Sequence, residues 1–182
     1  MPKTRRDLDR DDKVSEILEI TELRLREGGY NALSVAAVAR ELGLAHNAIY
    51  WYFPSKDHLI VATFEHMLHK LLANKPKAGR DVVGRVMWFV DQLGELYPLR
   101  ASMHEQAQRS EVIANYLDDL NNRLRSMTIH ALEPYVDEEE LELAAASFTA
   151  TVQGAFLAGT EPKERRRILT FALQRMITDH ES

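Results

Sequence analysis

Apolar residues in the first part of the chain recur at three- and four-residue intervals, the spacing of an amphipathic helix. The first such helix begins near Asp12 and has one apolar face, made of Val14, Ile17, Leu18, Thr21 and Leu25. Gly28 and Gly29 follow, and a glycine there can adopt the left-handed conformation that caps a helix. The pattern therefore predicts one helix that ends at these two glycines.

A pair of short helices is predicted on either side of Gly43. Ser34 can cap the first of them, which runs to Glu41 with four inward positions, Val35, Val38, Ala39 and Leu42. The second helix is expected from about residue 45 to residue 52, and Gly43 can adopt a positive φ in the turn between them. Three apolar residues are spaced to hold the second helix on a core: Leu44, Ile49 and Phe53.

The remainder of the chain also has the pattern of helices. After a turn over residues 53–56, Ser55 can cap a long helix that ends near residue 72, and a basic linker rich in helix breakers follows at 74–79. Five more helices are expected near residues 80–96, 99–108, 111–133, 138–159 and 162–179, with breaks at Pro98, Ser110, Pro134 and Pro162. No segment has the alternation of a strand, so the predicted fold class is all-α with about nine helices.

The composition narrows the class of protein and its compartment. The 182 residues suffice for one ordinary domain, or for a small N-terminal module beside a larger helical one. The chain has no cysteine, which excludes disulfides, thiolate nucleophiles and cysteine-based zinc sites and fits a reducing compartment. Residues 1–13 are charged and lack the apolar core of a signal peptide, and no eighteen apolar residues are consecutive. We therefore expect a soluble cytoplasmic protein with no membrane partner.

The net charge of −5 argues at first against nucleic acid, because Lys and Arg supply most of the binding to phosphates. The charge is unevenly distributed, however. Residues 28–80 hold six basic and three acidic side chains, a balance of +3, so the remaining segments carry −8. This asymmetry permits DNA binding without requiring it.

Two short helices joined by a glycine-containing turn form the arrangement that places its second helix in the DNA major groove. Three consecutive aromatics in that helix, Tyr50, Trp51 and Tyr52, need a core or a partner surface to cover them. A tyrosine hydroxyl can reach a phosphate oxygen while its ring packs on the sugar, and Lys56 adds charge at the next helix start. The alternative is that the aromatics pack between the first and fourth helices, with Trp51 partly in the core.

Three runs of residues together resemble the signature of the TetR family of transcriptional regulators. They read GYNALSV at 29–35, VARELGL at 38–44 and IYWYFPSKDHL at 49–59. The spacing of the glycines, the aromatic pair, the phenylalanine and the lysine agrees over thirty consecutive positions, which makes the resemblance more specific than a single short motif. Arg24 stands where the family more often has an apolar residue, and the sequence assigns it no role.

The resemblance implies an architecture and a function. A three-helix helix-turn-helix domain would occupy residues 1–56, a long helix near 56–72 would connect it, and an effector-binding and dimerisation domain would occupy 73–182. The implied protein is a homodimeric repressor that binds a near-palindromic double-stranded DNA operator and is released by a small-molecule effector.

The resemblance also implies roles at the DNA for individual residues. Phosphate contacts are expected from Tyr50, Tyr52 and Lys56, helped by Ser34 and Arg40. Base edges would be approached by His46, Asn47 and Ala48. The commonest family pattern resembles Ser-Lys-Gly-Thr where this chain has AHNA at 45–48, so a frequent basic contact becomes a histidine and the bases read stay open. The whole predicted DNA-binding set is Ser34, Arg40, Ala45, His46, Asn47, Ala48, Tyr50, Trp51, Tyr52 and Lys56.

The C-terminal half is expected to bind the effector and a second copy of the chain. Apolar residues occupy nearly every face of the 80–96 helix, so other helices must surround it. The predicted pocket lining is Trp88, Phe89, Met103, Tyr116, Met127 and Phe148, although each can equally be a filled core position. The last two helices each offer a face for another chain. The predicted dimer interface is Phe148, Val152, Ala155, Phe156, Ile168, Ala172 and Met176.

Other functions have less support in the sequence. An enzyme is disfavoured because there is no glycine-rich phosphate loop and no evident Ser-His-Asp constellation. A helical scaffold that binds proteins through Tyr50, Trp51 and Tyr52 is the alternative function. Glu65, His66 and His69 are interpreted as a polar helix surface rather than a metal site, and the basic run 165–167 as a solvated face. No metal or cofactor is predicted.

Overall fold

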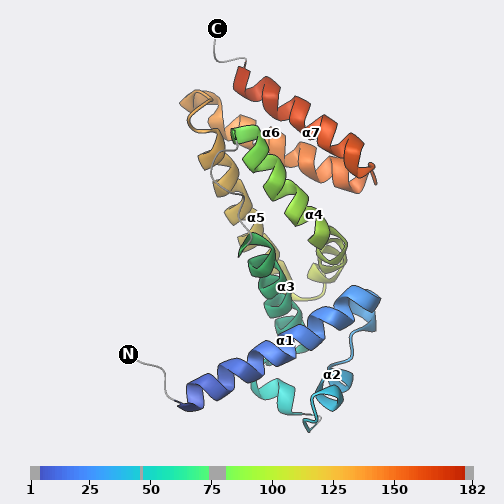
Figure 1. The fold of residues 1–182 in the computed structure, drawn as a ribbon. Coiled ribbons are helices and arrows are strands. Elements are labelled where there is room, and N and C mark those ends of the chain that lie inside the picture. Colours follow the sequence, from blue (N-terminus) through green and yellow to red (C-terminus); the bar gives the residue numbers. More distant parts are fainter. Residues whose placement is uncertain (1–4, 46, 74–80, 179–182) are drawn as a thin grey trace. The chain divides into compact units, whose positions relative to one another are not determined.

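The computed structural model describes residues 5–45, 47–73 and 81–178 (Figure 1). These residues form seven α-helices and one short 3-10 helix, η1, without a strand, so the all-α prediction is confirmed. The helices are α1 (Arg5–Ala32), α2 (Val35–Glu41), η1 (Ala48–Trp51), α3 (Lys56–Ala73), α4 (Val82–Ala107), α5 (Glu111–Leu132), α6 (Glu138–Leu157) and α7 (Pro162–Thr178). None of the described helices combines the length and the hydropathy that a bilayer-spanning segment requires.

The prediction of about nine helices is wrong in the described residues for two reasons. The segment expected as the third helix forms only η1, and α4 continues through Pro98 instead of breaking there. A proline inside a helix costs about 3 kcal/mol because it lacks the N–H donor and crowds the preceding turn. Burial of Leu96 and Leu99 on either side of Pro98 offsets this cost, and the Ser102 hydroxyl donates to the Pro98 carbonyl at 3.2 Å.

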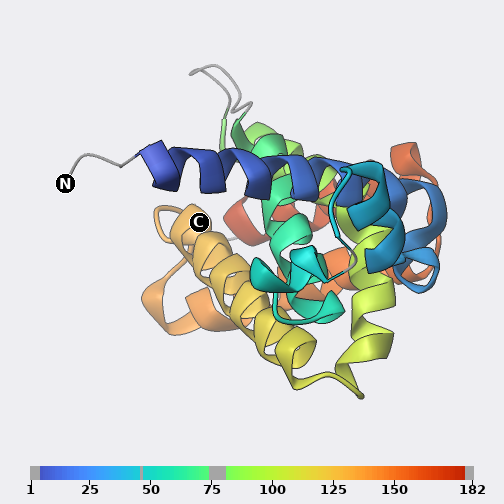
Figure 2. The ribbon, with the colours of Figure 1, turned by 90° about the horizontal axis from the view of Figure 1, so that it is seen from below.

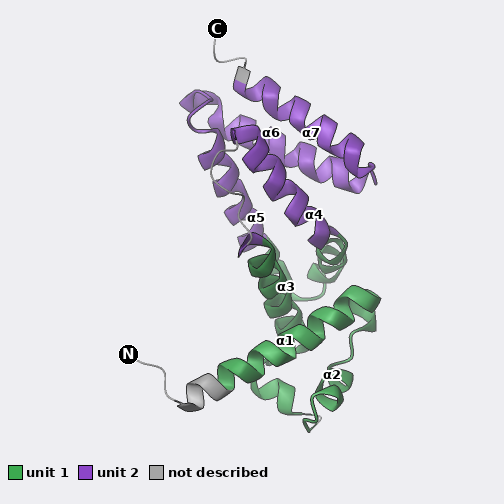
Figure 3. Cartoon of the chain, in the orientation of Figure 1, with its two compact units in different colours: residues 1–71, 98–117 green, residues 72–97, 118–182 purple. Residues whose placement is uncertain are grey.

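The chain divides into two compact units (Figure 3). Unit 1 comprises Met1–Leu71 and Pro98–Leu117, and unit 2 comprises Leu72–Tyr97 and Asp118–Ser182. Unit 1 therefore contains α1, α2, η1 and nearly all of α3, together with the end of α4 and the start of α5. Unit 2 contains the rest of α4 and α5 with α6 and α7.

Unit 1 has a core in which most of the predicted inward positions of the first helices are buried, whereas Val14 and Leu42 are half-buried. Ile17, Leu18 and Leu25 of α1 are all less than 10% exposed, and in α2 Val38 and Ala39 are fully buried. Thr21 is a polar residue in this buried apolar face, and it is tolerated there because its hydroxyl donates to the Ile17 carbonyl at 2.7 Å. In two views at right angles, α1 lies across α3 (Figures 1 and 2).

Unit 2 is built around a separate cluster of apolar side chains from α4, α6, α7, the end of α5 and the turn that follows it. Its buried members are Met87, Val90, Leu132, Val136, Ala145, Phe148, Ala155, Leu169 and Leu173. The turn between α6 and α7 uses Gly159 at a φ of 64°. The nine apolar residues predicted to be covered in the N-terminal part of α4 are all buried or half-buried, which agrees with a helix surrounded on most faces.

Candidate nucleic-acid interface

Local contacts fix both ends of α2, and the sequence predicts two of them, the Ser34 cap and the positive φ of Gly43. The Ser34 hydroxyl accepts a hydrogen bond from the Ala37 N–H at 3.3 Å, which caps α2 as predicted. Gly43 has a φ of 65°, and the Leu44 N–H donates to the Ala39 carbonyl at 2.8 Å. A residue with a Cβ would be strained at Gly43, so the glycine sets the direction in which the chain enters η1.

The apolar residues predicted to pack the second short helix on a core do hold η1 against the rest of unit 1. Ile49 is fully buried and Phe53 is 8% exposed, whereas Leu44 is half-buried. The segment is shorter and tighter than the helix predicted over residues 45–52, because only residues 48–51 have helical hydrogen bonding and they form a 3-10 turn. With three residues per turn, burying Ile49 directs the next two side chains away from the core.

Those two side chains are the main exposed feature of the surface. Trp51 is 84% exposed and Tyr50 is 43% exposed, while Tyr52 is half-buried. The alternative in which Trp51 lies partly in the core is therefore wrong. Two adjacent exposed aromatic side chains form a contiguous apolar patch, and such patches mark interaction sites more often than single exposed residues do.

The other predicted DNA-binding residues of unit 1 surround these aromatics along the chain. Ser34, Arg40, Ala45 and Asn47 are exposed, and Ala48 and Lys56 are half-buried. His46 lies outside the described residues. The accessible positions include a cation, an amide and two aromatic rings, which are the groups that proteins use on DNA backbones and base edges. Their roles at the DNA stay predictions.

The start of α3 carries a polar cluster that the sequence did not predict. Ser55 accepts from the His58 N–H at 3.3 Å and so caps α3 as expected. The Lys56 ammonium lies 4.8 Å from the centre of the Tyr30 ring, and the Tyr30 hydroxyl donates to Asp57 Oδ1 at 2.6 Å. Burial and the bond to Asp57 raise the pKa of Tyr30 to about 12, and burial lowers the pKa of Lys56. The only sequence signal for Tyr30 was its place beside Gly29 in the family signature.

Ion pairs join α1 to both neighbouring helices of unit 1. Arg24 donates to Glu41 Oε2 of α2 through Nη2 at 2.7 Å and Nε at 3.2 Å, which explains a cation at this position. Glu22, 9% exposed, accepts from Lys70 of α3 at 2.9 Å and from Arg26 at 3.0 Å. Burial by itself raises the pKa of Glu22, but the bonds from Lys70 and Arg26 outweigh burial and lower it.

Comparison with known proteins relates the segment that carries this surface to a family. Residues 17–63 match the model of the bacterial regulatory proteins of the tetR family. This segment of the chain belongs to the TetR family. Over 139 residues it is 27% identical to the HTH-type transcriptional regulator BetI of Rhizobium meliloti, covering 71% of this chain and 68% of BetI. It is also 27% identical to the HTH-type transcriptional repressor KstR of Mycobacterium tuberculosis, covering 70% of this chain and 63% of KstR.

Solved structures support the family's fold over nearly the whole chain. A transcriptional regulator from Rhodococcus sp. Rha1 matches with a TM-score of 0.75 at 19% identity, covering 93% of this chain and 98% of its own. A regulator from Saccharomonospora viridis, solved in complex with choline, matches with a TM-score of 0.69 at 17% identity, covering 90% and 96%. The chain thus has a TetR-family segment at residues 17–63 and shares the fold of such regulators, and the relatives named above are transcriptional regulators rather than enzymes.

The residues predicted to line an effector pocket fall in both units. Met103 and Tyr116 belong to unit 1, whereas Trp88, Phe89, Met127 and Phe148 belong to unit 2. Met103 and Phe148 are buried, Met127 is 48% exposed, and the others are half-buried. In unit 1 the Tyr116 ring meets the Phe64 ring edge-on with centroids 5.9 Å apart. The predicted pocket stays a prediction.

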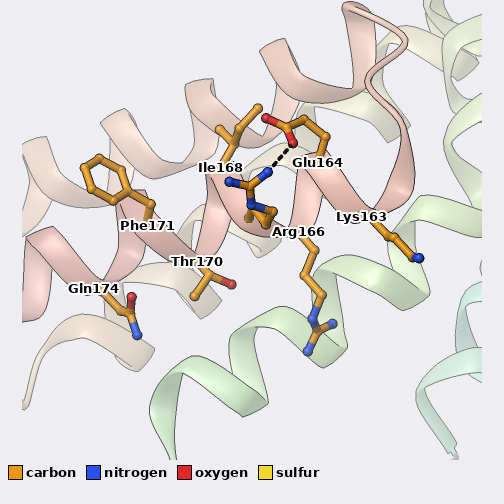
Figure 4. A pocket seen from close by; sticks show the side chains of 8 residues that line it. Lys163, Glu164, Arg166, Ile168, Thr170, Phe171 and Gln174 are labelled. Carbon is orange, nitrogen blue, oxygen red and sulfur yellow. Dashed lines mark hydrogen bonds and ion pairs between the residues drawn. The ribbon is translucent and has the colours of Figure 1, made fainter.

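An open groove of unit 2 lies along the charged side of α7 (Figure 4). Its lining includes Lys163, Glu164, Arg166, Arg167, Ile168, Thr170, Phe171 and Gln174. The basic run predicted as a solvated face is exposed at Arg166 and Arg167 and half-buried at Arg165, and each side chain makes surface contacts. Arg166 pairs with Asp91 of α4, Arg167 with Glu164 at 3.0 Å, and Arg165 donates to the Thr160 carbonyl at 3.1 Å. In the described residues, no three His, Asp or Glu side chains gather as a metal site would require.

The predicted dimer interface requires correction at two positions. Phe148 and Ala155 are 3% and 8% exposed, so the core of unit 2 leaves them almost no surface for another chain. Phe156 is stacked between the Tyr97 ring, 4.6 Å away between centroids, and the Arg165 guanidinium at 4.2 Å. Gly94 makes room for this stack, because a Cβ there would lie 3.0 Å from the Phe156 ring.

The remaining positions lie closer to the surface, beside exposed apolar residues that the sequence analysis missed. Ile168 is 38% exposed, and Val152, Ala172 and Met176 are half-buried. The missed residues are Leu143, Leu157 and Phe171, which are 71%, 75% and 62% exposed. Exposed positions of α6 recur at 143, 147, 150, 154 and 157, which is the helical period. The sequence therefore contained the pattern of this second face, but the other face of α6 is more apolar and was predicted as the interface instead.

Proposed function

We propose that this chain represses transcription by binding a near-palindromic operator as a homodimer, through η1 and the helix starts beside it. The observation that carries the proposal is the exposure of Trp51 and Tyr50 on a segment anchored by the buried Ile49. An anchored segment presents its outward side chains in a fixed direction, as groove recognition requires. The three-helix domain of residues 1–56 is the proposed reader, and residues 73–182 hold the effector and dimer surfaces.

The proposed contacts divide into backbone positioning and base reading. Tyr50, Tyr52 and Lys56 hold phosphates, because hydroxyl and ammonium groups there require no particular base. Ser34 and Arg40 add phosphate contacts at α2. Trp51, Ala45, His46, Asn47 and Ala48 lie against the groove, where Asn47 is suited to a bidentate contact with adenine.

The proposed dimer uses the outward faces of α6 and α7. Leu143 and Leu157 mark the ends of the open stripe of α6, and small residues between them, such as Ala150 and Gly154, permit close helix approach. On α7 the contributing residues are Ile168 and Phe171. Together with half-buried Val152, Ala172 and Met176, these apolar residues favour an isologous four-helix contact between two copies.

The proposed regulation is release of DNA by a small molecule bound among the C-terminal helices. Repression agrees with the names of the KstR relatives, and an organic ligand agrees with the choline complex of the S. viridis regulator. The effector must favour one arrangement by about 1–3 kcal/mol to change DNA affinity substantially. α3 is the proposed lever, because Glu22–Lys70 and Tyr30–Asp57 tie it to α1 and a tilt of α3 would move α1 with it.

Selection of bound sequences from a random pool of double-stranded DNA tests the proposal without assuming an operator. The full chain is expected to enrich a palindrome whose half-sites are about one helical turn apart, with affinity that falls steeply as salt rises. Absence of enrichment at low salt would overturn DNA reading and leave the protein-binding scaffold, in which Trp51 contacts another protein.

A further inference from the structure

Three side chains from two helices meet at the start of α3. Gly29, at a φ of 67°, redirects the chain at the end of α1 and leads directly into Tyr30. The Tyr30 ring lies under the Lys56 ammonium, 4.8 Å from the ring centre, and its hydroxyl donates to Asp57 Oδ1 at 2.6 Å. A single tyrosine therefore contacts both the first cation and the first carboxylate of α3.

These two neighbours have opposite effects on a phosphate at this helix start. The Lys56 ammonium attracts a phosphate, and so does the positive end of the α3 dipole. The Asp57 carboxylate repels it, although an acidic residue stabilises the helix start itself. Lysine side chains are also flexible, so holding the ammonium over a ring reduces the entropy lost when it binds.

The protonation of Tyr30 is compatible with this double role. Burial and the bond to Asp57 raise the pKa of Tyr30 to about 12, so the phenol stays a donor at neutral pH. The ring remains neutral there and can attract the Lys56 ammonium through its π face. Both contacts therefore persist over the pH range in which DNA binding is measured.

We propose that Tyr30 is a positioning residue for DNA binding: its ring places the Lys56 ammonium for a phosphate, and its hydroxyl holds the Asp57 carboxylate away from that phosphate. Tyr30 acts through these neighbours and does not itself touch DNA. The inference rests on the proposed function, because it needs a phosphate at Lys56. Wild-type binding to the selected palindrome is therefore measured first, and its absence would count against the proposed function rather than against Tyr30.

A double-mutant cycle tests the role of the ring. The variants are Tyr30→Leu, Lys56→Met and the double variant, each titrated with the selected duplex and with an unrelated duplex over a series of salt concentrations. Tyr30→Leu is expected to weaken binding to both duplexes about twofold to fivefold and to lower the salt slope towards that of Lys56→Met. In the Lys56→Met background Tyr30→Leu should cause no further loss. An equal loss in both backgrounds, or an unchanged salt slope, would overturn the proposal.

Two conservative replacements keep the test valid if Tyr30→Leu fails to fold. Fluorinated phenylalanines at position 30 retain the shape of the ring and weaken its π face, so DNA affinity should fall stepwise with fluorination. Constant affinity across that series would refute the role of the ring. Tyr30→Phe removes only the hydroxyl, and the loss it causes should be reversed by adding Asp57→Asn. If Tyr30→Phe binds as tightly as wild type, the hydroxyl has no such role.

Discussion

Replacing Trp51 by alanine separates DNA binding from folding, with Ile49→Ala as the matched variant on the same 3-10 turn. Trp51 is 84% exposed, so only about a sixth of its surface is buried in the free protein. At about 25 cal/mol per Å² and a side chain of about 250 Å², this burial contributes at most about 1 kcal/mol to stability. Ile49 is fully buried, and truncating such a residue costs about 2–5 kcal/mol.

The two variants should therefore behave oppositely in two assays. In thermal unfolding, Trp51→Ala is expected to lower Tm by less than about 4 °C, whereas Ile49→Ala lowers it by at least that amount. In fluorescence anisotropy with the selected duplex, Trp51→Ala should bind about tenfold more weakly, a loss of about 1.4 kcal/mol, because the ring contacts the DNA. If Trp51→Ala unfolds as early as Ile49→Ala, or binds DNA with unchanged affinity, the proposed interface is incorrect.

Three further predictions concern base reading, the dimer and acid stability. Tyr50→Phe should weaken binding to all sequences similarly and Asn47→Ala should change the preferred bases, as a repeated selection would reveal; an equal loss of preference in both variants would refute this division. Leu143→Asp should yield monomers in sedimentation, with Met127→Asp, also at an exposed apolar position, as the control that stays dimeric. Because the pKa of Glu22 is lowered in the folded protein, its contribution to stability is present above the unfolded value of 4.5 and is lost as pH falls through the folded pKa. The Tm difference between wild type and Glu22→Gln should accordingly be largest at neutral pH and shrink in acid, and a constant difference would contradict this origin.

Local signals in the sequence were sufficient to predict much of the structure of unit 1. The Ser34 and Ser55 caps, the positive φ of Gly43 and the burial of Ile49 depend on residues within a few positions of one another. Such preferences act through the backbone and the helical period, so they can be recognised without knowing the fold. The same pattern could not give the length of the recognition segment, because η1 is shaped by burying only Ile49 and Phe53.

Most of the features that could not be predicted from the sequence depend on contacts between residues far apart in the chain. Tyr30 and Asp57 are 27 positions apart and Arg24 and Glu41 are 17 apart, and no periodicity links them. Pro98 was predicted to end a helix, but tertiary burial on both of its sides overrides that local preference. On α6 the more apolar stripe, which includes Phe148, forms the core of unit 2, so the proposed dimer face is the less apolar one.

Oxidative footprinting of the full chain, free and bound to the selected duplex, tests the central claim most directly. Hydroxyl radicals label exposed side chains, so mass spectrometry can follow Trp51 and Tyr50 alongside the exposed controls Met127 and Tyr135. The proposed interface predicts that saturating DNA strongly protects Trp51 and Tyr50 and leaves Met127 and Tyr135 labelled as before. Unchanged labelling of Trp51 at saturation would contradict the assignment of η1 as the DNA-reading surface.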